Sequence, residues 1–225
     1  MHTSDGDPTA PNLRERRRRE TRSEISDAAL ALFEERGYAG TTVDDIAQRA
    51  GVSQRTVFRY FDTKEATVLG GVEDLAAELT AALVDEMPEN LVLQHVEAAH
   101  LRLLEEFVDD RPETIRRIRR IRCLILKDPD LRGAAALMEL ENVRTLTARI
   151  AEHLSPDVNP ILPRLLAEAG FTTLRVAFDA WVEKVEAGEK ADLTTVYRDC
   201  RTTLHGLLGP TATDETPRSG RAHSG

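Results

Sequence analysis

Apolar residues recur every three or four positions along most of this chain, and this spacing constrains the fold more than any other feature. Near the C-terminus, for example, the repeating positions are Leu193, Val196, Cys200, Leu204 and Leu207. Residues three and four apart share one face of an α-helix, whereas a half-buried strand requires strict alternation. The sequence shows no convincing alternating run of β-branched residues with hairpin turns. It therefore predicts an all-α fold.

Prolines indicate where the predicted helices end, because proline is disfavoured inside a helix and tolerated in its first turn. Six of the ten prolines lie between residues 88 and 163. The predicted helices span residues 14–36, 43–50, 54–60, 63–87, 90–109, 112–127, 129–154, 160–187 and 192–208. Residues 1–12 and 209–225 are rich in Pro, Gly, Ser, Thr and charge, so we expect an N-terminal extension and a C-terminal tail that are disordered.

Residues 41–65, TTVDDIAQRAGVSQRTVFRYFDTKE, contain two short predicted helices joined by a glycine turn. Thr42 is placed to cap the first helix, with Asp45 three residues later, and Ser53 is placed to cap the second. Gly51 lies between them and can adopt the positive φ that commonly ends a helix. This arrangement is typical of a helix-turn-helix, whose second helix enters the DNA major groove. An ordinary helical hairpin within a bundle is the alternative.

Spaced identities make this segment more specific than a bare helix-turn-helix. The pattern T-x-x-x-I-A-x-x-A-G-V-S-x-x-T-x-F-x-Y-F-x-x-K-E, from Thr42 to Glu65, resembles the N-terminal signature of the TetR family of transcriptional regulators. Upstream residues that fit the family's first helix are Ala28, Leu32, Phe33, Gly37 and Tyr38. The resemblance implies a three-helix DNA-binding domain at residues 13–66 and a helical effector-binding and dimerisation domain at residues 67–208.

The resemblance also implies DNA contacts, in which hydroxyl and ammonium groups meet phosphates and exposed side chains of the second helix reach base edges. The residues at these positions are Thr42, Ser53, Gln54, Arg55, Thr56, Arg59, Tyr60 and Lys64. For Arg59, a solvated or phosphate-bound side chain is equally compatible. Arg55 stands where many members carry glycine, and Phe58 where a tyrosine hydroxyl commonly meets phosphate. We expect Phe58 to pack against the protein instead.

Two arginine-rich segments lie outside the helix-turn-helix. Residues 13–22 hold six arginines and two glutamates and predict a DNA-binding arm formed by Arg16, Arg17, Arg18 and Arg19. A solvated helix extension with Glu–Arg pairs is the alternative. In residues 111–122, arginines surround Ile115, Ile118 and Ile121, which predicts either a solvated face paired with acids or a site for an anionic effector such as an acyl-coenzyme A.

A narrower likeness concerns the effector. Arg55 together with the sequence Phe58–Phe61 resembles regulators linked to mycofactocin systems, which respond to acyl-coenzyme A molecules. Membership of the family implies a mostly apolar pocket between the C-terminal helices, and each candidate lining residue could equally be ordinary core. The candidates are His95, Leu103, Phe107, Leu124, Met138, Asn142, Phe178 and Trp181.

The last two predicted helices resemble the family's dimerisation pair. Small residues that permit close helix approach are Ala169, Gly170, Thr173, Ala177 and Ala180. A two-fold symmetric homodimer would present its recognition helices to a palindromic operator. Gly70 and Gly71, inside the predicted helix at 63–87, mark either a bend or close packing against another helix.

The net charge of −9 argues against DNA as a partner until it is divided by region. Residues 13–65 carry a net charge of +1, with +4 on residues 13–22, whereas residues 66–225 carry −8. The acidity therefore belongs mainly to the effector domain, where it favours solubility and keeps that domain off DNA.

Several other classes of protein lack support in the sequence. It contains no apolar run long enough to span a bilayer, no secretory signal and only two cysteines, so we expect a cytoplasmic protein without a membrane partner, cofactor or metal. The usual phosphate-cradling and catalytic motifs are missing, which argues against an enzyme. The sequence thus predicts a repressor released from DNA by a small molecule. An activator, an effector-independent regulator, or a helical enzyme or adaptor that retained the motif are the alternatives.

Overall fold

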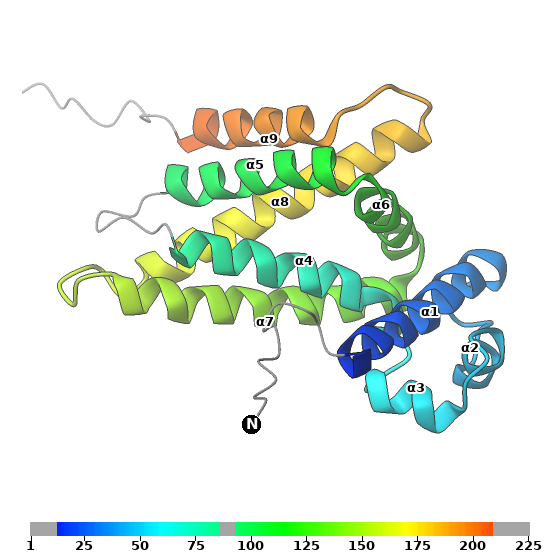
Figure 1. Ribbon diagram of the computed structural model, residues 1–225. Helices are drawn as coiled ribbons and strands as arrows, with labels where there is room; N and C mark the ends of the chain where they lie inside the picture. Colours follow the sequence, from blue (N-terminus) through cyan, green and yellow to red (C-terminus); the bar gives the residue numbers. More distant parts are fainter. Residues whose placement is uncertain (1–12, 86–92, 209–225) are drawn as a thin grey trace, which may run out of the picture.

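The computed structural model describes residues 13–85 and 93–208, and all regular structure within these ranges is helical (Figure 1). The helices are α1 (Leu13–Arg36), α2 (Val43–Arg49), α3 (Gln54–Tyr60), α4 (Ala66–Asp85), α5 (Leu93–Asp110), α6 (Pro112–Lys127), α7 (Pro129–His153), α8 (Leu162–Glu186) and α9 (Leu193–Leu208). The predicted all-α fold is confirmed. Helices α1 to α3 form one end of the molecule, and α4, α5, α7, α8 and α9 form a layered body beside them.

The largest difference from the predicted helix bounds concerns the start of α4, which we expected at residue 63. The Oγ1 atom of Thr63 accepts a hydrogen bond of 3.2 Å from the backbone N–H of Ala66. Thr63 therefore caps the helix instead of entering it. The predicted helix ends at 87 and 90 and the expected disorder of residues 1–12 and 209–225 lie outside the described residues.

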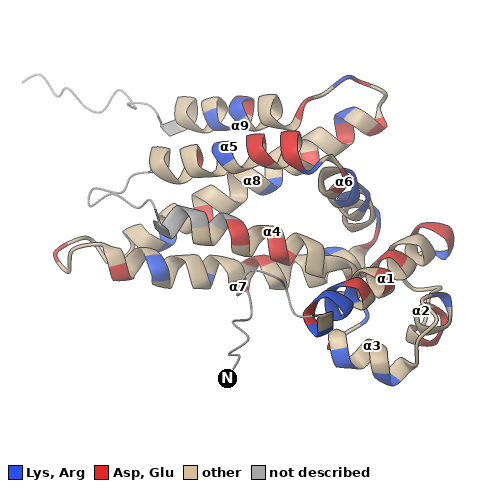
Figure 2. Ribbon diagram, viewed as in Figure 1, with Lys and Arg blue, Asp and Glu red and all other residues tan. Residues whose placement is uncertain are grey.

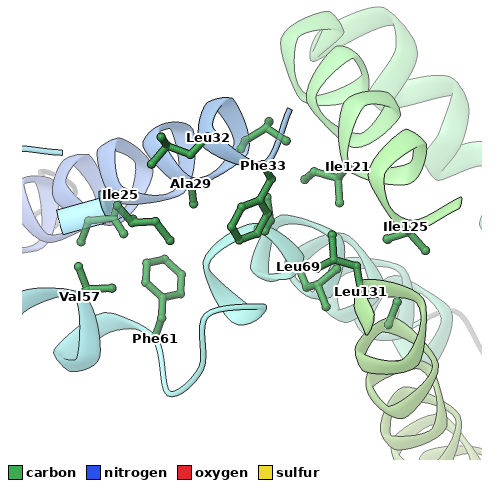
Figure 3. Packing of buried hydrophobic residues seen from close by; sticks show 14 of the residues in the cluster. Ile25, Ala29, Leu32, Phe33, Val57, Phe61, Leu69, Ile121, Ile125 and Leu131 are labelled. Atoms are coloured by element: carbon green, nitrogen blue, oxygen red, sulfur yellow. The ribbon is translucent and has the colours of Figure 1, made fainter. Parts of the chain in front are cut away.

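A single hydrophobic core joins the N-terminal helices to the helical body (Figure 3). Phe33 of α1 and Val57 of α3 belong to the same buried cluster as Leu69 of α4 and Ile121 of α6. The cluster continues into α7 through Leu131. The domain boundary predicted at residues 66 and 67 coincides with the start of α4, and hydrophobic packing continues across it.

Helix α8 organises the rest of the body, because it packs against both α7 and α9 and also against α5 and α6. The indole Nε1 of Trp181 donates a hydrogen bond of 3.1 Å to the carbonyl oxygen of Ala191. This bond holds the connection from α8 to α9, which turns at Gly188 with a φ of 83°. Trp181 thus has a structural role at the end of the body.

Of the two glycines inside α4, Gly70 allows an arginine of another helix to approach closely, whereas a side chain at Gly71 would meet its neighbours at ordinary contact distance. A Cβ atom at Gly70 would lie 2.9 Å from Nη2 of Arg22, which belongs to α1. A Cβ atom at Gly71 would lie 3.8 Å from Nε of Arg117, which belongs to α6. The helix assignment is continuous through both positions. The structure therefore supports close packing at Gly70, and neither glycine marks a break in the helix.

Buried polar groups join α5 to α9. Glu97 is fully buried, and its Oε2 lies 2.6 Å from Nε2 of His205 and 3.4 Å from Nε of Arg201. One turn further along α5, Nδ1 of buried His100 lies 3.4 Å from the hydroxyl of Tyr197. Burial lowers the pKa of His100 to about 4, so its imidazole is neutral in the folded protein near pH 7.

This burial predicts a pH dependence of stability. The unfolded chain binds a proton on His100 below about pH 6.5, whereas the folded protein resists it until about pH 4. The free energy of unfolding should therefore fall by about 3 kcal/mol through this residue as the pH drops across that window. Urea unfolding at several pH values should show a shallower dependence for His100→Gln than for the parent protein. Equal slopes in the two proteins would contradict the assignment.

Candidate DNA-binding surface and effector cavity

Side-chain caps fix the two short helices of the helix-turn-helix. The Thr42 hydroxyl accepts from the backbone N–H of Asp45 at 3.1 Å, and the Asp45 carboxylate accepts in return from the backbone N–H of Thr42 at 2.9 Å. The Thr42 hydroxyl also donates to the Asp45 carboxylate at 2.6 Å, and this bond, together with the one from the Thr42 backbone, lowers the pKa of Asp45. Gly51 ends α2 with a φ of 67°, and Ser53 caps α3 by accepting from the backbone N–H of Thr56 at 3.1 Å. The predicted caps are therefore present.

The exposed side of α3 presents side chains suited to base edges. Gln54 donates from Nε2 to Asp44 of α2 at 2.9 Å, so this amide must exchange that contact to reach DNA. Arg55 is exposed, and the guanidinium of Arg59 lies 5.1 Å from the ring centroid of Tyr60. Phe58 is 52% exposed, so the expected packing of this ring is wrong. Val57 is the only buried residue of α3. Consecutive side chains on a helix point in different directions, so Phe58 faces away from the core that Val57 enters.

The basic arm and the recognition helix meet in one groove. This groove lies between the first turns of α1 and the end of α3, and it is lined by Arg14, Arg17, Arg18, Thr21, Arg59 and Tyr60. Figure 2 shows the basic residues gathered at this end of α1, close to α3. Arg16 instead pairs with Glu20 at 2.9 Å, and Arg19 is exposed outside the groove lining. Of the four predicted arm residues, the structure brings Arg17 and Arg18 to α3.

Lys64 has a structural position inside the DNA-binding end. Its Nζ donates to the carbonyl oxygens of Tyr38 and Thr41, both at 2.9 Å, and lies 3.7 Å from the ring centroid of Tyr38. An ammonium group has three donors, so one remains for a phosphate. The same residue therefore ties the α1–α2 connection to the start of α4.

The arginine-rich face of α6 is paired with acids, mostly on other helices. Arg117 and Arg120 form ion pairs with Asp27 and Glu34 of α1. Arg111 pairs with Glu78 of α4, and Arg116 pairs with Glu113 within α6. These contacts favour the paired-face interpretation over an anion-binding site. They also make α6 a second connection to the DNA-binding helices, beside α4.

A small cavity of about 60 Å³ lies among α4, α6, α7 and α8. Three of the predicted pocket residues line it, namely Met138, Asn142 and Phe178. The other five predicted pocket residues lie elsewhere. His95 is exposed on α5, and Leu124 packs beside the N-terminal core. The remaining three belong to the hydrophobic cluster around α5, α8 and α9, namely Leu103, Phe107 and Trp181. Polar lining residues that the sequence did not reveal are Arg122, Glu139 and Arg175. The sequence did contain one indication that Arg122 faces inward: it lies four residues after Ile118, and this spacing puts both side chains on one face of α6.

Comparison with known proteins agrees with this arrangement. Residues 25–69 match the family described as bacterial regulatory proteins of the tetR family, and residues 90–205 match the MftR C-terminal domain. The chain belongs to the TetR family of transcriptional regulators. Within that family its C-terminal domain is of the MftR type, which confirms the likeness to mycofactocin-system regulators.

Three relatives illustrate the range of similarity. MftR of Mycobacterium tuberculosis, named for transcriptional regulation of mycofactocin biosynthesis, is 32% identical over 74% of this chain and 80% of its own length. The repressor Rv3405c of the same species is 40% identical over 33% of this chain and 40% of its own length. The crystal structure of FadR from Bacillus subtilis with stearoyl-CoA shares the fold, with a TM-score of 0.51, 18% identity, and coverage of 81% of this chain and 96% of that one.

Neither a membrane span nor a metal site occurs in the described ranges. No helix in residues 13–85 or 93–208 has the length and hydropathy needed to cross a bilayer. The same part of the chain holds no cluster of three or more His, Cys, Asp or Glu side chains arranged to bind a metal.

The groove between α1 and α3 predicts a salt-sensitive contribution to DNA affinity. The double variant Arg17→Ala/Arg18→Ala should weaken binding to all duplexes similarly and reduce the slope of log affinity against log salt by about 0.9 for each phosphate that is no longer neutralised. Fluorescence anisotropy with a random duplex and a promoter duplex at several salt concentrations measures this. Arg144→Ala/Arg149→Ala, which changes the charge equally on exposed α7 positions, should retain the parent slope. Parent-like affinity of the first variant at every salt concentration would rule out DNA binding by the arm.

Proposed function

We propose that this protein is a repressor that binds a palindromic operator as a homodimer in the cytoplasm and is released by a small-molecule effector. The observation that carries the proposal is the capped helix-turn-helix whose exposed α3 face adjoins the basic groove with α1. Repression is favoured over activation because a relative with a matching N-terminal segment is named a repressor.

Exposed apolar surface on α8 and α9 supports the homodimer. A groove between these helices has a mostly apolar lining that includes Ala169, Val176, Ala180, Val196 and Leu204. Val176 is 43% exposed and Leu207 is 76% exposed. A contiguous apolar groove of this kind is typical of a surface that another chain covers. We propose that the α8–α9 pair of one protomer packs against that of its partner as a four-helix bundle.

The walls of the cavity support coupling between effector and operator. Ligand pockets usually enclose roughly 300–1,000 Å³, so a cavity of about 60 Å³ must widen to hold an effector. Its walls include Leu75 of α4 and Ile118 of α6. Both helices are joined to α1, through Arg22–Asp74 from α4 and through the pairs that Arg117 and Arg120 of α6 make. Widening would therefore move the DNA-binding ends, and DNA would weaken effector binding by the same factor.

An acyl-coenzyme A stays a candidate effector. FadR of similar fold binds stearoyl-CoA in its crystal structure, but at this low identity the likeness carries the fold alone. Calorimetric titration with acyl-coenzyme A molecules tests the candidate, and it fails if no heat of binding is detected at high concentration.

The operator is the primary test of the proposal. We expect footprinting of the region upstream of the protein's own coding sequence to show protection of an inverted repeat, because a two-fold dimer presents both recognition helices symmetrically. Arg55→Ala should lower affinity for the protected site by about tenfold or more, because a guanidinium can make two hydrogen bonds to guanine. The same change should leave binding to a random duplex nearly unaltered. Protection of no repeat, or equal loss on both duplexes, would contradict sequence-specific binding through α3.

The dimer surface has a separate test. Val176→Glu places a charge in the proposed interface, where burying it unpaired is costly, so light scattering should show a shift from dimer towards monomer at micromolar concentration. Leu137→Glu provides a matched control, because Leu137 is 72% exposed on α7 and does not line the α8–α9 groove. A parent protein that is monomeric at this concentration would refute the interface.

A further inference from the structure

One buried donor at the wall of the cavity lacks a partner. The Arg122 side chain lines the cavity and is only 8% exposed. One of its terminal nitrogens, Nη2, donates to Asp179 of α8. Its Nε–H, in contrast, is buried and has no hydrogen-bond partner. An unpaired buried donor on a charged group costs free energy, so a ligand acceptor at this position would gain a strong hydrogen bond.

The charges beside this donor are already balanced. Asp179 pairs with Arg122 and lies 3.9 Å from Arg175, and Arg175 in turn donates to Glu139 at 3.1 Å. Two guanidinium groups and two carboxyl groups thus form a neutral row. A ligand carboxylate or phosphate would add a third negative charge to this partly buried site, and a buried charge without its own partner is costly. An uncharged acceptor adds no such cost.

The remaining wall of the cavity is apolar. Leu75 of α4, Met138 of α7, and Phe171 and Phe178 of α8 contribute to it. Met138 is half-buried, and its unbranched side chain can change rotamer to make room. The cavity can therefore take a hydrocarbon body when it widens, and widening beside Arg122 would uncover its unpaired Nε–H.

We infer that the part of the effector held in this cavity is uncharged and largely apolar, with a carbonyl oxygen that accepts a hydrogen bond from Nε of Arg122. The inference rests on the proposed function only in taking this cavity as the effector site. It assigns Arg122 as the residue that selects the polar group of the ligand. It also assigns the apolar residues of α4 and α8 as those that select its body.

The protein contains a natural reporter of this cavity. Trp181 is its only tryptophan. The ring centroid of Trp181 lies 6.4 Å from that of Phe178, with the two planes at 74°. Because Phe178 lines the cavity, movement of its ring on ligand binding should alter the fluorescence of Trp181. Binding can thus be measured on the full chain without a label.

The experiment compares three probes of equal chain length, namely 2-nonanone, nonane and nonanoate. They are titrated against the protein with Trp181 fluorescence as the readout. Arg122→Lys is the decisive variant, because lysine retains the positive charge beside Asp179 and lacks the Nε–H. Arg116→Lys, on the exposed face of the same helix, is its matched control.

We expect 2-nonanone to bind at least tenfold more tightly than either nonane or nonanoate. Arg122→Lys should weaken 2-nonanone by about tenfold and leave nonane within twofold, whereas Arg116→Lys should leave both unchanged. The inference is overturned if nonanoate binds as tightly as the ketone, if Arg122→Lys retains parent affinity for the ketone, or if no probe binds. Circular dichroism of each variant checks that it is folded, and a misfolded Arg122→Lys is replaced by Arg122→Gln, whose amide side chain is shorter.

Operator footprinting on the same samples separates this inference from the proposed function. Protection of an operator together with absent probe binding would leave the DNA-binding proposal intact and remove the inference. Probe binding that depends on Arg122, with no protected operator, would support the inference about the cavity and contradict the DNA-binding proposal.

Discussion

Burial of α1 against two helices of the effector domain is the interaction on which this molecule depends. Phe33 contributes to a core that also contains Leu69 of α4 and Ile121 of α6. A helix-turn-helix of this length has little apolar surface of its own, and small cores are marginally stable. The shared core therefore stabilises the DNA-binding helices and fixes their orientation relative to the effector cavity. Because packed cores resist gradual deformation, the proposed widening of the cavity would shift whole helices.

Ion pairs at the edge of this core define the orientation of α1 more than they add to the stability of the fold. Arg117–Asp27, Arg120–Glu34 and Arg22–Asp74 all end on partly exposed groups, for which each pair contributes about 0–1 kcal/mol. Their geometry is nevertheless specific, since α1 is held from α6 on one side and from α4 on another. Small movements of either helix can then exchange these pairs at little cost in free energy.

The sequence predicted the fold and the DNA-binding motif well, because both depend on local rules. Helical periodicity, proline positions and the caps at Thr42 and Ser53 all act within a few residues of one another. The cavity lining was harder to predict, because it comes from four helices whose rotation about their axes depends on tertiary packing. Met138 and Asn142 were assigned to it, while Arg122 was interpreted as part of a charged surface segment. Phe58 shows the converse error, since an aromatic residue was expected to be buried and lies exposed on the recognition helix.

The uneven distribution of charge has a kinetic consequence. Positive side chains gather where α1 adjoins α3, while acidic side chains are prominent on the helical body away from that end (Figure 2). An uneven distribution of this kind gives a molecule an electric dipole, on which the field of a DNA duplex would exert a torque during diffusion. The α3 end would be turned towards the phosphates before contact, and encounters through the acidic body would be repelled. The unfavourable net charge would therefore help to orient the protein and raise the fraction of collisions that lead to binding.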